Sequence, residues 1–241
     1  MHLNRIFLHP EKYPAKNCYP FNQQIFKKSK VIHFDSPVSF FIGENGTGKS
    51  TLLEAIAHKC GIHIWCNEER MRYEVNPYEK SLHHYLNIEW ENDQVPGSFF
   101  GADIFRHFVQ SLDEWAVADP AMLQYFGGKS LVTQSHGQSL LSFFRARYKI
   151  RGLYLLDEPE TALSPRSQLE LLKLLVKMAE AGHAQFIIAT HSPILMACPD
   201  ATIFNFDVIP IEPVEYQHTE HYLVYKDFML NPDKYLPVNE K

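Results

Sequence analysis

One glycine-rich run constrains the fold of this chain more than any other feature: Gly43-Glu44-Asn45-Gly46-Thr47-Gly48-Lys49-Ser50. A short apolar segment, residues 38–42, leads directly into it. Residues 50–60 follow it, with their apolar side chains at helical spacing, and Gly61 stands where glycine commonly ends a helix. The pattern predicts a strand, a tight loop and a helix, which together form the first unit of an α/β domain.

The same run fits the pattern G-x-x-x-x-G-K-[ST] in full. Its glycines allow the backbone to curl so that successive N–H groups form an anion-binding nest, and the helix N-terminus adds partial positive charge. Lys49 is predicted to reach the β- and γ-phosphates of ATP, and the Ser50 hydroxyl to ligate Mg²⁺. The residues predicted to bind ATP here are Gly43, Asn45, Gly46, Thr47, Gly48, Lys49, Ser50 and Thr51.

Two adjacent carboxylates follow a second apolar segment, residues 153–156. In a parallel sheet, the strand ends beside a phosphate loop are where ligand chemistry is located. Asp157 is predicted to hold Mg²⁺, directly or through water. Glu158 is predicted to take a proton from the water that attacks the γ-phosphate.

The remaining pattern predicts a single α/β domain over residues 1–241, with right-handed βαβ units and a largely parallel sheet. Residues 137–149 suit a helix. A longer helix begins with Ser164 as N-cap and Pro165 at its first position, and it ends at Gly182. This long helix has leucine on nearly every side, so we expect it to be buried on more than one face. Residues 186–189 read as another strand.

Two segments carry weaker patterns. Residues 62–130 are polar and rich in aromatic side chains, and we expect them to form an inserted, mostly helical lobe. The last 40 residues are expected to add edge strands and a short helix, and no candidate site residue is evident among them.

Three further motifs stand in a fixed order around Asp157. They are Ser135-His136-Gly137-Gln138-Ser139, beginning 22 residues before it, Thr161-Ala162-Leu163-Ser164, and Ala189-Thr190-His191-Ser192-Pro193, with His191 34 residues after it. Together with the glycine loop they resemble the signature motif, the D-loop and the switch histidine of the ABC ATPase superfamily. The chain most resembles its RecF/SMC-like branch of small stand-alone AAA-family ATPases.

The resemblance implies roles for particular residues. Ser135 and Gly137 would contact the γ-phosphate bound by a second protomer, and His191 would contact that of its own protomer. Glu158, His191 and Lys49 would be the catalytic residues, and ATP and Mg²⁺ the ligands. Because the signature segment cannot fold back onto its own phosphate loop, the resemblance implies a homodimer with ATP sandwiched between its protomers.

Other positions are less well defined. Glu160 stands where transporters usually carry Thr, and Ser164 where they usually carry Asp; both favour the soluble branch. Gln94 and Gln110 are the candidates for a Q-loop glutamine. Tyr19 or Phe21 could stack on adenine, although both also suit an aromatic core.

The function predicted from these residues is ATP hydrolysis to ADP and phosphate that gates or drives a partner protein. The resemblance suggests DNA repair or anti-phage defence as its setting. Two alternatives stay open: the nucleotide-binding subunit of a transporter, and a scaffold that ATP clamps without turnover. An intact Glu158 argues against the scaffold.

Composition limits the partners. A formal net charge of −5 does not favour a broad nucleic-acid surface. Residues 27–30 form a small basic run, and nucleic acid stays open as a partner. No apolar stretch approaches the roughly 20 residues of a membrane span, and the N-terminus lacks the apolar core of a signal peptide. The expected location is therefore cytoplasmic. A zinc site built from His58, Cys60, His63 and Cys66 is an alternative with unusual spacing.

Overall fold

A computed structural model describes residues 1–64, 76–101 and 136–236 of the chain. The strands are β1 (Leu3–Leu8), β2 (Val31–His33), β3 (Val38–Ile42), β4 (Leu86–Trp90), β5 (Gly97–Gly101), β6 (Gly152–Asp157), β7 (Ala184–Ala189), β8 (Thr202–Asn205) and β9 (Glu212–Pro213). The helices are α1 (Gln24–Lys28), α2 (Lys49–Lys59), α4 (His136–Arg147), α5 (Pro165–Glu180), α6 (Pro193–Met196) and α7 (Glu220–Leu230).

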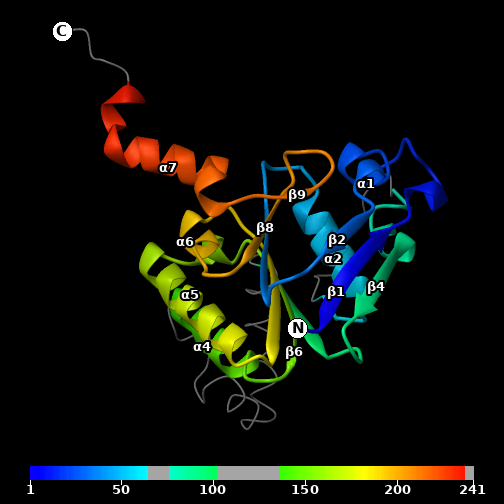
Figure 1. Ribbon diagram of the computed structural model, residues 1–241, viewed down its shortest axis with the longest axis horizontal. Helices are drawn as coiled ribbons and strands as arrows, with labels where there is room; N and C mark the ends of the chain where they lie inside the picture. The colour runs from blue at the N-terminus through cyan, green and yellow to red at the C-terminus, as the bar shows by residue number, and fades with distance from the viewer. Residues whose placement is uncertain (65–75, 102–135, 237–241) are drawn as a thin grey trace.

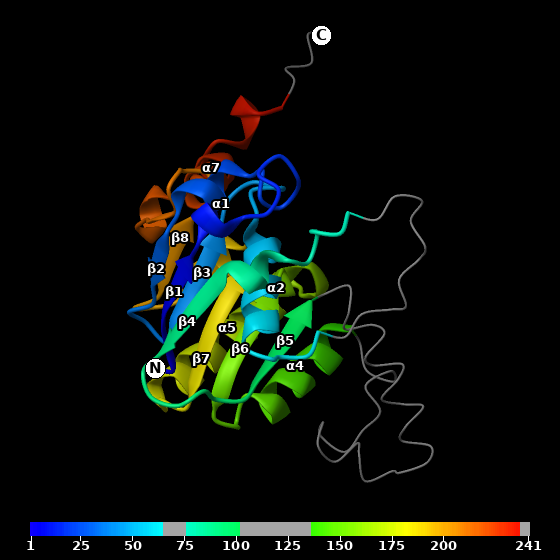
Figure 2. The same cartoon turned by 90° about the vertical axis from the view of Figure 1, so that its right-hand side faces the viewer.

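The larger sheet has the strand order β5-β6-β7-β3-β8-β9 within the described residues. All neighbours in it run parallel except β8 and β9, which are antiparallel. The predicted largely parallel α/β sheet is therefore confirmed. A smaller antiparallel sheet, ordered β2-β1-β4, lies over one face of the larger one (Figures 1 and 2).

The central strands are mostly apolar and buried along almost their whole length, because both faces of the sheet are covered. Successive side chains of a strand point to opposite faces. Phe41 accordingly joins one core and Phe40 the other, and Leu155 and Leu156 divide in the same way. Each strand thus contributes to two cores, which explains runs such as residues 153–156.

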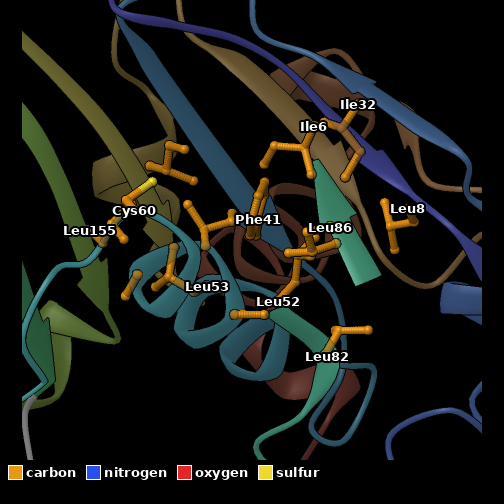
Figure 3. Close-up of a cluster of buried hydrophobic side chains, with 14 of the residues drawn as sticks. Ile6, Leu8, Ile32, Phe41, Leu52, Leu53, Cys60, Leu82, Leu86 and Leu155 are labelled. Atoms are coloured by element: carbon orange, nitrogen blue, oxygen red, sulfur yellow. The ribbon is translucent and has the colours of Figure 1, made fainter. Parts of the chain in front are cut away.

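The first core lies between the two sheets and is built around α2. Leu52 and Leu53 of this helix are fully buried, and in Figure 3 they lie among Phe41, Ile6 and Leu86 from the surrounding strands. The predicted helix after the glycine loop is confirmed. Its burial fixes the position of the loop from which it begins.

The second core lies on the opposite face, under α4, α5 and α6 (Figure 1). Here the expectation that the long helix is buried on more than one face was wrong. Leu171 and Leu175 of α5 are fully buried, whereas Leu169 is 48% exposed. The helix is amphipathic, because only the stripe at i, i+4 spacing faces the sheet.

The predicted ends of two helices are confirmed. The Ser164 hydroxyl accepts a hydrogen bond from the backbone N–H of Ser167 at 3.2 Å, and Pro165 is the first residue of α5. Gly61 and Gly182 follow α2 and α5 with φ of 67° and 73°, the left-handed conformation that commonly ends helices.

The structure corrects the expected lobe over residues 62–130 where it describes them. Residues 86–90 form β4 in the small sheet, and residues 97–101 form β5, which pairs with β6 in the large one. These strands belong to the body of the domain because their side chains, such as Leu86 and Phe99, complete the first core. The rest of the expected lobe falls largely outside the described residues.

The C-terminal helix α7 projects from the body (Figure 1). It has no buried residue, and its exposed side chains include Leu223, Val224, Tyr225, Phe228, Met229 and Leu230. In the described part of the chain, no helix is both long and apolar enough to cross a membrane.

Candidate functional site

The glycine loop joins β3 to α2 and encloses the Lys49 side chain. The Lys49 ammonium donates to the carbonyl oxygens of Gly43 at 2.6 Å and Glu44 at 2.9 Å, and only 4% of the residue is exposed. Burial lowers the pKa of Lys49, and the carboxylates of Glu158, Asp207, Asp157 and Glu44 oppose that shift. A lysine held in this way is a buried positive charge directed at the centre of the loop.

The N-terminus of α2 carries no side-chain cap. Gly48 precedes the helix with φ of 102°, and a Cβ there would lie 2.7 Å from the Phe26 ring, so the position requires glycine. The first-turn N–H groups of an 11-residue helix therefore lack a capping side chain. Uncapped N–H groups, the helix dipole and Lys49 together suit a bound phosphate group.

Ser50 and Asp157 form the first contact between the loop and the end of β6. The Ser50 hydroxyl donates to Asp157 Oδ1 at 3.0 Å. Burial raises the pKa of Asp157 to about 7, and nearby Glu158 and Glu54 add to the shift. A half-buried carboxylate and a hydroxyl at one point are oxygen ligands of the kind that Mg²⁺ prefers, so the residues present fit that ion.

Glu158 has an unusual backbone conformation. Its φ and ψ of 46° and 53° lie in the left-handed region, which a residue with a side chain occupies only at a cost of about 1–2 kcal/mol. Its N–H donates to the carbonyl of Ala189 at 2.9 Å, and its own carbonyl accepts from the Thr161 hydroxyl at 2.8 Å. Such conformations concentrate at functional sites, and this one places Glu158 beside His191.

His191 follows β7 and is held from two sides. Its backbone N–H donates to Glu160 Oε1 at 2.6 Å, and its ring Nε2 lies 3.8 Å from Glu158 Oε1. Burial lowers the pKa of His191, as do the nearby charges of Lys49 and His221. Glu160, the residue that differs from the usual transporter pattern, therefore acts as a structural acceptor that fixes the start of the His191 segment.

Two site residues come from the last 40 residues, where the sequence offered no candidate. Asp207 Oδ1 accepts from the Glu44 N–H at 2.8 Å and so holds the first turn of the loop. His221 Nε2 lies 3.0 Å from His191 Nδ1. Neither residue stands in a recognisable motif; the strand order brings them here, so no local pattern could have revealed them.

The candidates for adenine stacking and for the Q-loop glutamine differ in where the structure places them. The Tyr19 hydroxyl bonds the Thr51 hydroxyl at 2.5 Å, beside a cavity of about 270 Å³ that Ser50 also lines. Phe21 is fully buried in the first core, which removes it as an adenine-stacking candidate. The Gln94 amide donates to the Cys60 carbonyl, at the end of α2 remote from the glycine loop, so Gln94 does not reach the phosphates. Gln110 lies outside the described residues.

The signature motif is described only in part. Ser135 lies outside the described residues, and Gly137 falls in the first turn of α4. The Thr161–Ser164 segment does contact the His191 segment indirectly. Gln168 donates to the Leu163 carbonyl and accepts from the Ser192 hydroxyl. The Thr161–Ser164 segment and the segment that follows β7 are thus tied together through Gln168.

Comparisons with known proteins match both halves of this site. Residues 17–59, which hold the glycine loop, match a family model described as "AAA domain". Residues 138–197, which hold Asp157, Glu158 and His191, match one described as "AAA domain, putative AbiEii toxin, Type IV TA system". The chain is also 28% identical over 171 residues to the cytochrome c biogenesis ATP-binding export protein CcmA of Rickettsia bellii, covering 67% of this chain and 83% of that protein.

A solved structure of an ABC transporter component shares the fold of this chain. CbiO1 from Clostridium perfringens, part of the ABC transporter complex cbiONQ, matches with a TM-score of 0.50 and 19% identity, covering 86% of this chain and 90% of that one. The SMC head domain from Thermotoga maritima matches with a TM-score of 0.49 and 19% identity, covering 89% and 100%. The chain is similar in sequence to AAA and ABC-type ATPase proteins, and it has the fold of ABC-type ATPase domains. This similarity supports ATP binding.

The zinc alternative has no support within the part of the chain that the structure describes. No group of three or more histidine, cysteine or acidic side chains gathers there at metal-binding distance. Cys60 is buried, which raises the pKa of its thiol to about 12 and disfavours a thiolate ligand. Cys66 lies outside the described residues.

Proposed function

We propose that this domain hydrolyses ATP to ADP and phosphate as a homodimer, and that the cycle gates or drives a partner protein. The observation that carries the proposal is the convergence of Lys49, Ser50, Asp157, Glu158 and His191 at the carboxyl edge of one sheet. This is the edge where open parallel sheets bind ligands.

Each residue has a distinct task in this proposal. Lys49 exchanges its two bonds to loop carbonyls for the phosphate oxygens. Ser50 and Asp157 would hold Mg²⁺, which would neutralise charge on the phosphates when bound. Glu158 accepts the proton of the attacking water, and the strained backbone places its carboxylate at the edge of the loop. His191 Nε2 then donates to the γ-phosphate.

The dimer rests on the signature motif. Ser135 and Gly137 are proposed to contact the γ-phosphate bound by the second protomer, with Gly137 in the first turn of α4. That placement would offer another helix N-terminus to the phosphate. The match to a family described with a Type IV TA system is in keeping with a defence role. A net charge of −5 leaves nucleic acid as a weakly supported partner.

A transporter subunit is the second candidate, favoured by the likeness to CcmA, whose name describes an export protein. Glu160 argues against it, because the structure uses this carboxylate, in place of the usual transporter Thr, to bond the His191 backbone. Purification from membranes together with a membrane-spanning subunit would support the transporter and overturn the stand-alone assignment.

The decisive test compares Glu158→Gln with Glu180→Gln, a matched change at the exposed end of α5. Without general-base assistance, turnover should fall about 10²–10⁴-fold in Glu158→Gln, while MgATP binding persists. The variant should be a stable dimer with MgATP in light-scattering measurements, and adding Ser135→Arg should abolish that dimer. Unchanged turnover in Glu158→Gln would show that Glu158 is not the general base. A dimer that forms equally without ATP would contradict the model in which ATP is bound between two protomers.

A further inference from the structure

The switch histidine has a second histidine as its neighbour. His191 Nδ1 and His221 Nε2 lie 3.0 Å apart, a hydrogen-bond distance between residues 30 positions apart in the sequence. Their ring centroids are 5.2 Å apart and the ring planes differ by 47°, so the contact is nitrogen to nitrogen and not a stack. His191 follows β7, and His221 lies in the first turn of α7.

A bond between two imidazoles fixes where their protons lie. A neutral imidazole has one N–H and one acceptor nitrogen, so one ring must donate and the other accept. Burial lowers the pKa of both rings, which keeps both neutral near pH 7. The choice of donor therefore determines which nitrogen of His191 carries its proton.

The surroundings of His191 decide the direction. Its other nitrogen, Nε2, faces Glu158 Oε1 at 3.8 Å. If His191 donated from Nδ1, its Nε2 would present a lone pair to that carboxylate and to an incoming phosphate, which is repulsive. If His221 donates, His191 carries its proton on Nε2 and presents an N–H to both anions.

We propose that His221 is a positioning residue, which donates to His191 Nδ1 and so holds His191 in the tautomer that presents Nε2–H to the γ-phosphate. The inference rests on the proposed function of His191. It deepens that function, because the ring that contacts phosphate is oriented by a residue of a different element.

The element that carries His221 is only lightly attached. α7 has no buried residue, and it is anchored at its start by Thr219, whose hydroxyl caps the helix, and by the Tyr216 hydroxyl, which donates to the Pro193 carbonyl at 3.0 Å. A shift of α7 would remove the donor from His191. The position of α7 on the body of the domain is therefore coupled to the orientation of the His191 ring.

The test compares His221→Gln and His221→Leu, with His218→Gln as an exposed control beside the helix. The Gln amide nitrogen lies at about the same distance from Cα as His Nε2 and can donate, whereas Leu keeps the volume without a donor. We expect kcat to fall about 10–100-fold in His221→Leu, as is typical when a residue that orients a ligating side chain is lost, with KM little changed, and His221→Gln to restore most of it. Equal loss in both variants, or loss in neither, would overturn the proposal.

A second readout does not depend on hydrolysis. In nucleotide-free protein with ¹⁵N-labelled histidine, His191 signals are assigned by their loss in His191→Gln. We expect the ¹⁵N chemical shift of His191 Nδ1 to be that of an unprotonated acceptor nitrogen, and the shift of Nε2 to be that of a protonated N–H. A proton on Nδ1 in the wild type would overturn the proposal. If the wild type shows the expected tautomer but hydrolyses no ATP, the proposed function fails while the positioning contact stands.

Discussion

The Ser50 hydroxyl donates a hydrogen bond to the Asp157 carboxylate across 107 positions of sequence. The sheet order explains the contact. β7 lies between β3 and β6, and Ala189 is in register with both Phe41 and Asp157. The phosphate loop and the acidic strand end therefore emerge at the same level of the same edge, with His191 following the strand between them.

Lys49→Ala should weaken MgATP binding about tenfold to a hundredfold, because a charge-assisted contact to phosphate contributes about 1.5–3 kcal/mol. Isothermal titration calorimetry measures the affinity. Lys59→Ala, an exposed lysine at the far end of the same helix, is the matched control and should bind as wild type. Equal affinity in Lys49→Ala and wild type would show that the loop is not the phosphate site.

Glu158 offers a stability test that is independent of catalysis. At an ordinary helical or extended position Gly is less stable than Ala, by about 0.5–1 kcal/mol. At φ of 46° the order should reverse, because Gly adopts the left-handed region without the clash of a Cβ. We expect urea unfolding to show Glu158→Gly more stable than Glu158→Ala by about 1 kcal/mol. If Glu158→Ala is instead more stable than Glu158→Gly, residue 158 does not have the left-handed backbone conformation in solution.

The His191–His221 pair should make stability depend on pH. The folded pKa of each ring lies below the ordinary value of 6.5, so between the two values the unfolded chain binds more protons. Stability from the pair is therefore full above about pH 6.5 and is lost as the pH falls through the folded pKa values. The charged groups that face the pair are Lys49, Glu44, Glu158, Asp207 and Glu220.

Urea unfolding between pH 5 and 8 measures this dependence. The double change His191→Gln with His221→Gln should flatten the decline at low pH, and His218→Gln should not. Part of the decline should remain in the double variant, because burial also lowers the pKa of His58 and His83. An unchanged slope in the double variant would show that the pair does not take up protons on unfolding.

Ser164 caps α5, and its removal should cost stability. Ser164→Ala should lower the free energy of unfolding by about 1 kcal/mol, because the Ser167 N–H loses its acceptor. Ser164→Asp keeps an acceptor and should stay near wild type, which separates loss of the cap from change of the D-loop. If Ser164→Ala and Ser164→Asp lower the stability equally in thermal or urea unfolding, the capping hydrogen bond contributes nothing to stability.

The sequence by itself determined the features that depend on contiguous residues. The groups of a glycine loop that are predicted to bind phosphate are its own backbone N–H groups, Lys49 and the N-terminus of the following helix, and all of these are adjacent in the chain. The cap at Ser164 and the helix ends at Gly61 and Gly182 are local for the same reason. The acidic strand end was recognisable because Asp157 and Glu158 follow an uninterrupted apolar run.

Only the tertiary structure decided what depends on distant packing. Residues 97–101 become a strand of the main sheet because they pair with β6, although their own pattern is weak. The leucines of α5 divide into buried and exposed because the sheet covers only one side of the helix. Asp207 and His221 enter the site through the order of strands β7, β3 and β8, which no local pattern encodes. Contacts of this kind arise from the arrangement of whole elements, so a single sequence read along its length does not reveal them.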